Sequence, residues 1–321
     1  MSTGFWDFRI AISPAVSILA FMNFLKSSHY SVTLLLCALF TPTLRAQEAK
    51  APANSHHTLW KIQGKQATVY LLGSVHALQD KDYPLPSIIE NAFTNSRVVA
   101  FETDIGELES PALAMKMLSK SQLPEGQTLE NVLSPQVYKT FMKHVDDSGT
   151  PAIMVERMKP AMAAITLEVF ELIKMGLNPQ NGVDKHFYPL AQSAGKEIIP
   201  LETVEYQLDL VTGFSKEEGE LLMKSTLKEI DNVKKEFGEL VKAWREGDAD
   251  KLQKLMNEAM ADSPAIYKRL LTDRNHNWIP KIKELVRGDK NAIIIVGAGH
   301  LVGKEGVVEL LQKDGLTVTQ E

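Results

Sequence analysis

The stretch Ala292-Ile293-Ile294-Ile295-Val296-Gly297-Ala298-Gly299-His300 decides the fold class of this 321-residue chain. A solid apolar run of this length is typical of a short strand that is buried on both faces. Helices are expected on either side of it, over residues 279–286 and from His300 through Leu311. A strand between two helices indicates an α/β protein.

The same order of elements occurs near the other end of the domain. Residues 58–63 and 67–72 predict a hairpin, and its second strand runs directly into Gly73-Ser74-Val75-His76. A helix over residues 84–96 and a strand over residues 97–101 are expected to follow. Residues 316–319 predict a last strand at a sheet edge.

Helical periodicity dominates the long segment between these ends, residues 108–267. The candidate helices cover residues 135–145, 160–175, 183–193 and 216–245. One predicted strand, residues 196–201, interrupts them. We therefore expect a parallel or mixed central sheet flanked by helices, with a large helical insertion.

The first 46 residues have the pattern of a secretory signal region that starts at Met22. Lys26 supplies positive charge, residues 32–40 form an apolar run, and Ala46 precedes the expected cleavage point. The run is shorter than the about 20 residues that span a membrane, so no stable span is expected after cleavage. The alternative is an uncleaved anchor that includes residues 10–25.

The mature protein is therefore expected to be periplasmic or secreted. A flexible leader over residues 47–57 would precede a single domain over residues 58–321. Cys37, the one cysteine in the sequence, lies in the apolar run, so the mature protein would have neither a disulfide nor a catalytic thiol.

The amino-acid composition limits the kinds of partner that can be expected. The chain is 44% hydrophobic, which is enough apolar material for a sizeable core. Its 35 basic and 40 acidic residues are mixed along the sequence and give a formal net charge of -5. Without a basic stripe, nucleic acid is not expected as a partner.

Polar side chains stand at four predicted strand ends. They are His76, Glu102, Glu202 and His300. Because ligands of open α/β sheets bind beyond the carboxyl ends of the strands, we expect two imidazoles and two carboxylates to meet in one crevice.

Imidazole and carboxylate groups suit a divalent metal such as Mn, Co or Zn, with His76 and His300 as ligands and Glu102 as a ligand or the general base. The same residues also suit acid-base chemistry without a metal, and whether Glu102 or Glu202 is the general base stays open. Arg274 is a candidate partner for a carboxylate or an oxyanion.

The glycines of these loops, Gly73, Gly297 and Gly299, would let the chain turn tightly and bring backbone amides close to a ligand.

A structural role is the alternative for any one of these residues. A histidine after a strand is more often a hydrogen-bonded turn residue, and a glutamate there can stabilise a helix N-terminus. Arg274 fits a surface ion pair equally well. The occurrence of such polar residues at four separate strand ends favours a functional site over four independent structural roles.

Several known motifs are absent from the sequence. It has no Gly-x-Ser-x-Gly, no His-Glu-x-x-His and no Gly-x-x-x-x-Gly-Lys-Ser/Thr. In the segment from Gly297 to Gly303 the third glycine comes one position late for a dinucleotide-binding loop.

Across the mature chain the sequence resembles the TraB/GumN family, which is related to the TIKI metalloproteases. The matching stretches are Tyr70-Leu71-Leu72-Gly73-Ser74-Val75-His76, Phe101-Glu102, Gly182-Val183-Asp184-Lys185-His186-Phe187, Pro200-Leu201-Glu202-Thr203, Arg274-Asn275 with Trp278, and Val296 to Gly303. The resemblance implies an α/β fold and, as in the TIKI members, peptidase activity that depends on manganese or cobalt.

Two functions follow as hypotheses. The first is an exported metal-dependent hydrolase, including a peptidase, that acts on a peptide or small molecule. The second is a non-enzymatic periplasmic protein that holds a metal or haem on the same scaffold. The sequence leaves the substrate and the oligomeric state open.

Overall fold

The computed structural model describes residues 56–230, 233–259 and 263–321. The predicted signal region, Cys37 and most of the predicted leader lie outside the described residues. Within the described ranges, no helix is long and apolar enough to cross a membrane.

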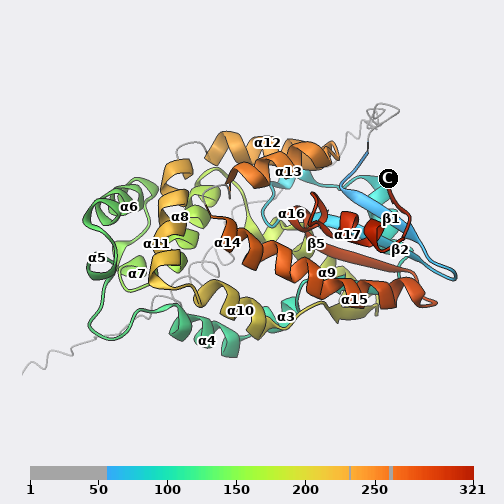
Figure 1. Cartoon of the computed structure of the whole chain (residues 1–321), viewed down its shortest axis with the longest axis horizontal. Coiled ribbons are helices and arrows are strands. Elements are labelled where there is room, and N and C mark those ends of the chain that lie inside the picture. Colours follow the sequence, from blue (N-terminus) through green and yellow to red (C-terminus); the bar gives the residue numbers. More distant parts are fainter. Residues whose placement is uncertain (1–55, 231–232, 260–262) are drawn as a thin grey trace, which may run out of the picture. The chain divides into compact units, whose positions relative to one another are not determined.

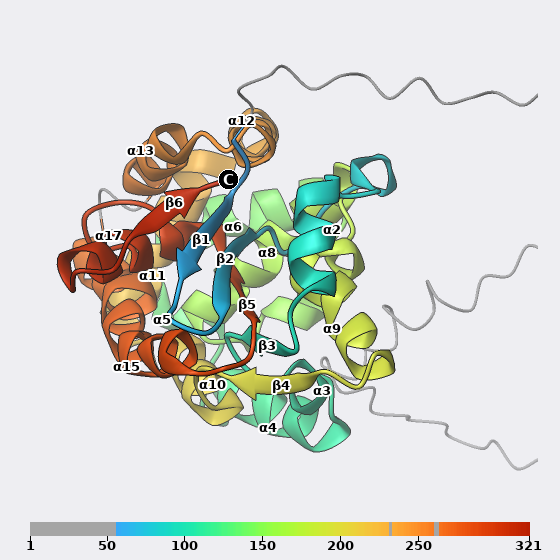
Figure 2. The ribbon, with the colours of Figure 1, turned by 90° about the vertical axis from the view of Figure 1, so that its right-hand side faces the viewer.

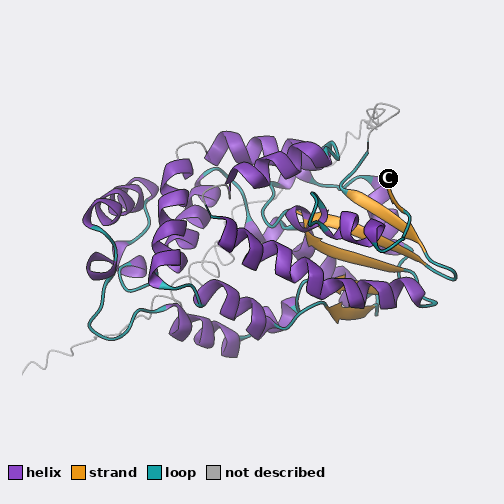
Figure 3. Ribbon diagram, viewed as in Figure 1, coloured by secondary structure: helices purple, strands orange, loops and turns teal. Residues whose placement is uncertain are grey.

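In the described part of the chain, six strands form one mixed sheet (Figure 1 and Figure 3), and pairing of the strands gives the order β4-β3-β5-β2-β1-β6. They are β1 (Leu59–Gln63), β2 (Thr68–Ser74), β3 (Val98–Phe101), β4 (Glu197–Pro200), β5 (Ala292–Gly297) and β6 (Val318–Gln320). Every strand predicted from the sequence is present, and β6 lies at an edge as expected. The predicted α/β fold class is confirmed.

Four neighbouring strands, β4, β3, β5 and β2, run parallel to one another. The predicted hairpin makes β1 antiparallel to β2, and β6 is antiparallel to β1. The parallel strands all end at the same edge of the sheet. Residues that follow β2, β3, β4 and β5 are therefore neighbours in space.

Helices cover both faces of this sheet. Figure 2 shows α2 (Ser87–Thr94) and α9 (Val183–Ser193) on one side of it, and α15 (Asp273–Arg287) and α17 (Val307–Lys313) on the other. The residues of β5 from Ala292 to Val296 are buried, as expected for a parallel strand between two helical layers.

The helical insertion contributes most of the remaining helices. They are α3 (Ile105–Leu108), α4 (Pro111–Ser121), α5 (Leu129–Val132), α6 (Pro135–Ser148), α7 (Ala152–Val155), α8 (Pro160–Lys174), α10 (Val204–Thr212), α11 (Lys216–Glu229), α12 (Val233–Arg245), α13 (Ala249–Ala259) and α14 (Pro264–Tyr267). Proline occupies the first turn of α4, α6, α8 and α14, where its missing N–H costs nothing. Phe141, Leu167 and Met223 are fully buried where α6, α8 and α11 pack together.

Two predicted helices are each divided in the structure. Residues 216–245, predicted as one helix, form α11 and α12. α11 packs against α8 and α6, whereas α12 packs mainly against α13 and less against α8. The helix expected after β5 forms α16 (Ala298–Leu301) and α17. Gly303, with a φ of +88°, takes a left-handed conformation between them.

A third predicted helix starts earlier than expected. The helix predicted over residues 279–286 is part of α15, which begins at Asp273 after a π-helical turn over Lys268–Thr272. The polar residues at its start have no apolar periodicity, so the sequence pattern hides them. Arg274 and Asn275 are nevertheless buried, and they contact Glu102, Glu202 and His300 at the carboxyl edge of the sheet.

Candidate functional site

The four polar residues predicted at strand ends all lie at the carboxyl edge of the sheet. Glu102 follows β3 directly, His76 and Glu202 follow β2 and β4 by two residues, and His300 lies in the short helix α16 after β5. The backbone N–H of Glu202 donates to the carbonyl oxygen of Glu102 at 2.9 Å.

Arg274 is the cation at the centre of this group. Its Nη2 donates to Glu102 Oε2 at 2.5 Å and to Glu202 Oε1 at 2.6 Å, and its Nε lies 3.0 Å from Glu202 Oε1. The residue is 8% exposed, so the interpretation of Arg274 as part of a surface ion pair is wrong. A single guanidinium bridges the two buried carboxylates.

Glu202 has donors at both carboxylate oxygens. Oε1 accepts from Arg274 and from Gln207 Nε2 at 2.8 Å, and Oε2 accepts from Trp278 Nε1 at 3.0 Å. With its lone pairs engaged in this way, Glu202 holds Arg274 in place and is poorly placed to take a proton from a substrate.

Three residues of this network had no assigned role in the sequence analysis: Gln207, Asn275 and Trp278. Gln207 lies on α10, one helical turn after Thr203, whose side chain caps that helix. Asn275 and Trp278 share the buried face of α15 with Arg274. Asn275 and Trp278 are signalled in the sequence by the family resemblance and by their spacing from Arg274 on one helical face, whereas Gln207 has no such signal.

His300 is buried, 4% exposed, with both ring nitrogens engaged. Asn275 Nδ2 donates to the carbonyl of Glu305 at 2.7 Å, so its Oδ1 must accept from His300 Nδ1, 2.6 Å away. His300 Nε2 therefore carries a lone pair, which accepts from Arg274 Nη1 at 3.0 Å. The ring also lies against Trp278, with centroids 4.5 Å apart.

The charge state of His300 follows from these surroundings. Burial lowers the pKa of His300, Arg274 lowers it further, and together they outweigh Glu102 and bring it to about 3. The imidazole is therefore neutral at neutral pH. Neutral imidazole is the form that binds metals.

Glu102 is ionised. Its Oε1 accepts the backbone N–H of Gly297 at 2.7 Å, and its Oε2 accepts from Arg274 and from Gln207 at 3.1 Å. Burial would raise the pKa of Glu102, but His300 and Arg274 outweigh this effect and lower the pKa to about 2. Oε1 keeps a second lone pair for a further ligand.

His76 is the accessible member of the group. Its side chain is 66% exposed, and its Nδ1 lies 3.4 Å from Asp184 Oδ2. Loss of hydration would lower the pKa of His76, but the carboxylates of Asp184 and Glu102 outweigh it and raise the pKa to about 9. Because the ring is exposed, water and salt screen part of this effect.

The three proposed ligands converge on Gly297. A Cβ added to this glycine would lie 3.3 Å from Glu102 Oε1, 3.5 Å from His76 Nε2 and 3.5 Å from His300 Cδ2. The φ of Gly297 is −50°, which any residue can adopt, so glycine serves here to keep the centre open. Its amide is directed at the Glu102 carboxylate.

The other two predicted glycines allow close packing. A Cβ on Gly73 would lie 2.5 Å from Thr58 Cγ2, and one on Gly299 would lie 2.9 Å from the methyl group of Met256. Both positions therefore admit a neighbouring side chain, and neither has a φ in the left-handed region.

The donors fit a divalent metal in their chemistry. His300 Nε2 and Glu102 Oε1 are 3.8 Å apart, somewhat more than the about 3 Å between two ligands of one ion. Among the described residues, no three His, Cys, Asp or Glu side chains form a ready metal cluster. Nη1 of Arg274 must release His300 Nε2 before that nitrogen can bind a metal.

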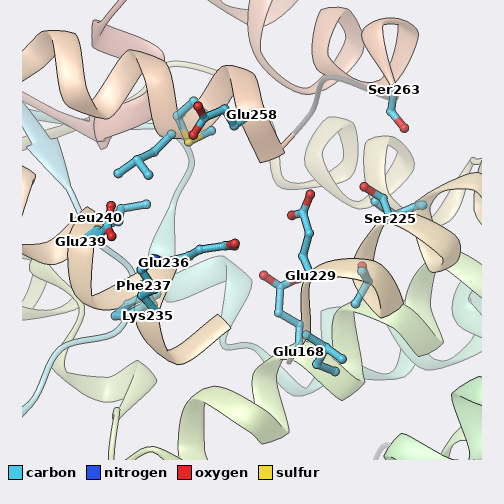
Figure 4. A pocket seen from close by; sticks show the side chains of 15 residues that line it. Glu168, Ser225, Glu229, Lys235, Glu236, Phe237, Glu239, Leu240, Glu258 and Ser263 are labelled. Atoms are coloured by element: carbon cyan, nitrogen blue, oxygen red, sulfur yellow. The ribbon is translucent and has the colours of Figure 1, made fainter. Parts of the chain in front are cut away.

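A separate cavity of about 480 Å³ lies between α11, α12 and α13 (Figure 4). Apolar residues including Phe237, Leu240 and Met256 line it together with glutamates such as Glu236 and Glu258. None of the strand-end residues lines this cavity. Met256 is the link between the two regions, because it also packs against the Gly299 loop.

In a comparison with known proteins, one family model matches nearly all of the described chain. The model of the TraB/PrgY/gumN family matches residues 58–320. No solved structure matches the chain.

Named relatives are distant. Metalloprotease TIKI1 of Xenopus tropicalis is 21% identical over 81% of this chain and 60% of its own length. Metalloprotease TIKI2 of Danio rerio is 22% identical over 92% of this chain and 68% of its own length. An uncharacterized protein of Treponema pallidum is 20% identical, covering 81% of this chain and 82% of that protein. The chain thus spans about 60% of the length of the TIKI1 relative.

Proposed function

Because this chain belongs to the TraB/PrgY/gumN family, we propose that it is an exported, metal-dependent hydrolase that cleaves peptide bonds. The observation that carries the proposal is the convergence of His76 Nε2, Glu102 Oε1 and the His300 ring around the open space at Gly297. The names of the TIKI metalloproteases, which are similar to this chain, support the peptidase class.

The proposed ligands are His76 Nε2, Glu102 Oε1 and His300 Nε2. A bound Mn, Co or Zn ion would polarise the scissile carbonyl and activate water. Glu102 is ionised and His300 is neutral at neutral pH, so neither has to lose a proton to act as a ligand, whereas His76, whose pKa is raised, releases its Nε2 proton when the metal binds. The exposed His76 places the centre within reach of a substrate from solution.

Arg274 and Glu202 have supporting roles in this proposal. Arg274 remains bound to Glu202 and to the Leu270 carbonyl at 3.0 Å when it releases His300, so it keeps a positive charge beside the centre. This charge stabilises a developing oxyanion. Glu202 fixes Arg274, which leaves Glu102 as the carboxylate next to the reacting atoms.

Export is part of the proposal and rests on the signal-like pattern around Lys26, residues 32–40 and Ala46. The test therefore starts from the full chain expressed in a bacterial host. Protein recovered from the periplasm should begin at Gln47. Protein that stays uncleaved in the cytosol would contradict export.

The recovered protein is then freed of metal with a chelator and incubated with a peptide library, with or without Mn²⁺, Co²⁺ or Zn²⁺. Mass spectrometry of the products should show cleavage only with metal. Glu102→Gln should lower the rate by about 10²-fold or more, because it removes the negative charge and most of the basicity. Glu197→Gln, in an exposed pair with Lys290, is the matched control and should keep the full rate.

Whether the Glu102→Gln variant keeps its metal distinguishes two roles for Glu102. If Glu102→Gln keeps its metal and loses rate, Glu102 is the general base, and if it loses the metal, Glu102 is a ligand. Cleavage that survives both chelation and Glu102→Gln would overturn the proposal. An intense Soret band without cleavage would instead favour a haem-binding protein.

A further inference from the structure

Asp184 lies outside the centre described above but faces one of its histidines. It is the second residue of α9, and its side chain is 22% exposed. Its Oδ2 lies 3.4 Å from His76 Nδ1, which is within ion-pair distance. Its Oδ1 is buried and has no hydrogen-bond partner among the described residues.

The start of α9 is fixed directly against the His76 loop. The backbone N–H of Val183 donates to the carbonyl of Val75 at 3.1 Å. A Cβ on Gly182 would lie 2.7 Å from the carbonyl oxygen of His76 and 2.8 Å from Asp184 Oδ1. Glycine at this position therefore allows the carboxylate and the loop to approach each other.

The two nitrogens of His76 face opposite partners. Nδ1 faces Asp184, and Nε2 lies 3.5 Å from the Cβ position of Gly297, toward the centre. A carboxylate at Nδ1 holds a proton on that nitrogen, so that in the neutral ring Nε2 is the nitrogen with the lone pair for a ligand. For a side chain that is 66% exposed, such a partner also restricts the ring to one orientation.

A simpler role for Asp184 is an acidic residue that stabilises the N-terminus of α9. That role would account for the carboxylate in the first turn, but it gives no reason for Oδ2 to point at His76. Nor does it account for the glycine that makes room for Oδ1.

From these contacts we infer that Asp184 is the positioning residue of His76, holding its Nε2 toward the metal. The inference deepens the proposed function and rests on it. The counterpart for His300 is Asn275, which holds Nδ1 of that ring at 2.6 Å.

Calorimetric titration of the exported, metal-free protein with Mn²⁺ and with Zn²⁺ tests this role. Asp184→Ala should weaken metal binding by about 10- to 100-fold, as loss of a partner behind a metal-binding histidine does. Asp184→Asn should restore most of the affinity, because its amide oxygen still accepts from Nδ1. A residue that only stabilised the helix through its charge would not show this rescue.

The matched control is Glu90→Ala. Glu90 of α2 faces His186, which lies on α9 like Asp184 but is not one of the proposed ligands, with 3.5 Å between Glu90 Oε1 and His186 Nε2. This variant should bind metal like the wild type. Equal affinity of the Asp184→Ala and wild-type proteins would overturn the inference while leaving the proposed function intact.

Failure of the wild type to bind any metal would instead contradict the proposed function. The role of Asp184 would then be decided by a crystal structure of the Asp184→Ala protein. Its His76 ring should turn so that Nε2 no longer faces Gly297. An unchanged ring would overturn the inference by itself.

Discussion

The segments Gly73 to His76 and Gly297 to His300 have the same Gly-x-x-His spacing and begin in the last residues of neighbouring parallel strands, yet their imidazoles have opposite surroundings. The side chain of His76 is 66% exposed and has one carboxylate partner, whereas that of His300 is 5% exposed, with both nitrogens engaged. The pKa of His76 is raised to about 9 and that of His300 is lowered to about 3. The shared motif sets the position of each ring but not its charge.

The difference comes from the helices that cover each loop. Residues of α15 surround His300, with Asn275 at one nitrogen, Arg274 at the other and Trp278 against the ring. At His76, the one such partner among the described residues is Asp184 of α9, which faces Nδ1. One half of the centre is therefore buried and hydrogen-bonded, and the other half is open to solvent.

Removing Arg274, the cation of the buried half, should have the largest effect on the free energy of unfolding. Arg274→Met leaves two buried carboxylates without their shared partner, so the free energy of unfolding should fall by about 3–5 kcal/mol. Urea denaturation measures the change. Lys290→Met, in an exposed pair with Glu197, is the control and should cost no more than about 1 kcal/mol. A loss for Arg274→Met as small as the control's would show that the charges are not desolvated.

Replacing each of the two histidines should change the free energy of unfolding by a smaller amount, and the two changes should differ. His300→Ala removes a ring packed on Trp278 and leaves two polar partners unsatisfied, so it should cost about 2–4 kcal/mol. His76→Ala removes an exposed ring and should change the free energy of unfolding by about 0.5 kcal/mol or less. Urea denaturation of the two metal-free variants makes the comparison. Equal losses would mean that burial of the His300 ring contributes no more to stability than the exposed His76 ring does.

Alanine substitutions at the first glycines of the two motifs, Gly73 and Gly297, should show the smallest difference in stability. In Gly73→Ala the new methyl group would meet the Thr58 side chain at 2.5 Å and the Cα of Ala298 at 3.1 Å, so about 1–3 kcal/mol of stability should be lost. Gly297→Ala should leave stability nearly unchanged and reduce metal affinity, because its methyl group enters the centre. Thermal denaturation and metal titration of both variants test this. If Gly73→Ala instead reduced metal affinity and Gly297→Ala reduced stability, the open space would lie at Gly73.

Prediction from the sequence was most successful where the signal is local. An apolar run bounded by glycine or a polar residue identifies each strand, and the parallel arrangement then places His76, Glu102, Glu202 and His300 at one edge. The division of residues 216–245 into α11 and α12 was missed, because both helices have the same charge-rich periodicity and differ only in what they pack against.

By itself, the sequence determined the fold class, the strand ends and the family, since these depend on short-range patterns of apolar residues, glycines and motifs. Only the tertiary structure decided that Arg274 is buried between Glu102 and Glu202, that His300 is neutral, and that Asp184 faces His76. The physical reason is that burial and Coulomb interactions depend on distances between residues far apart in the chain. Glu102 and Arg274 are separated by 172 positions in sequence and by 2.5 Å in space.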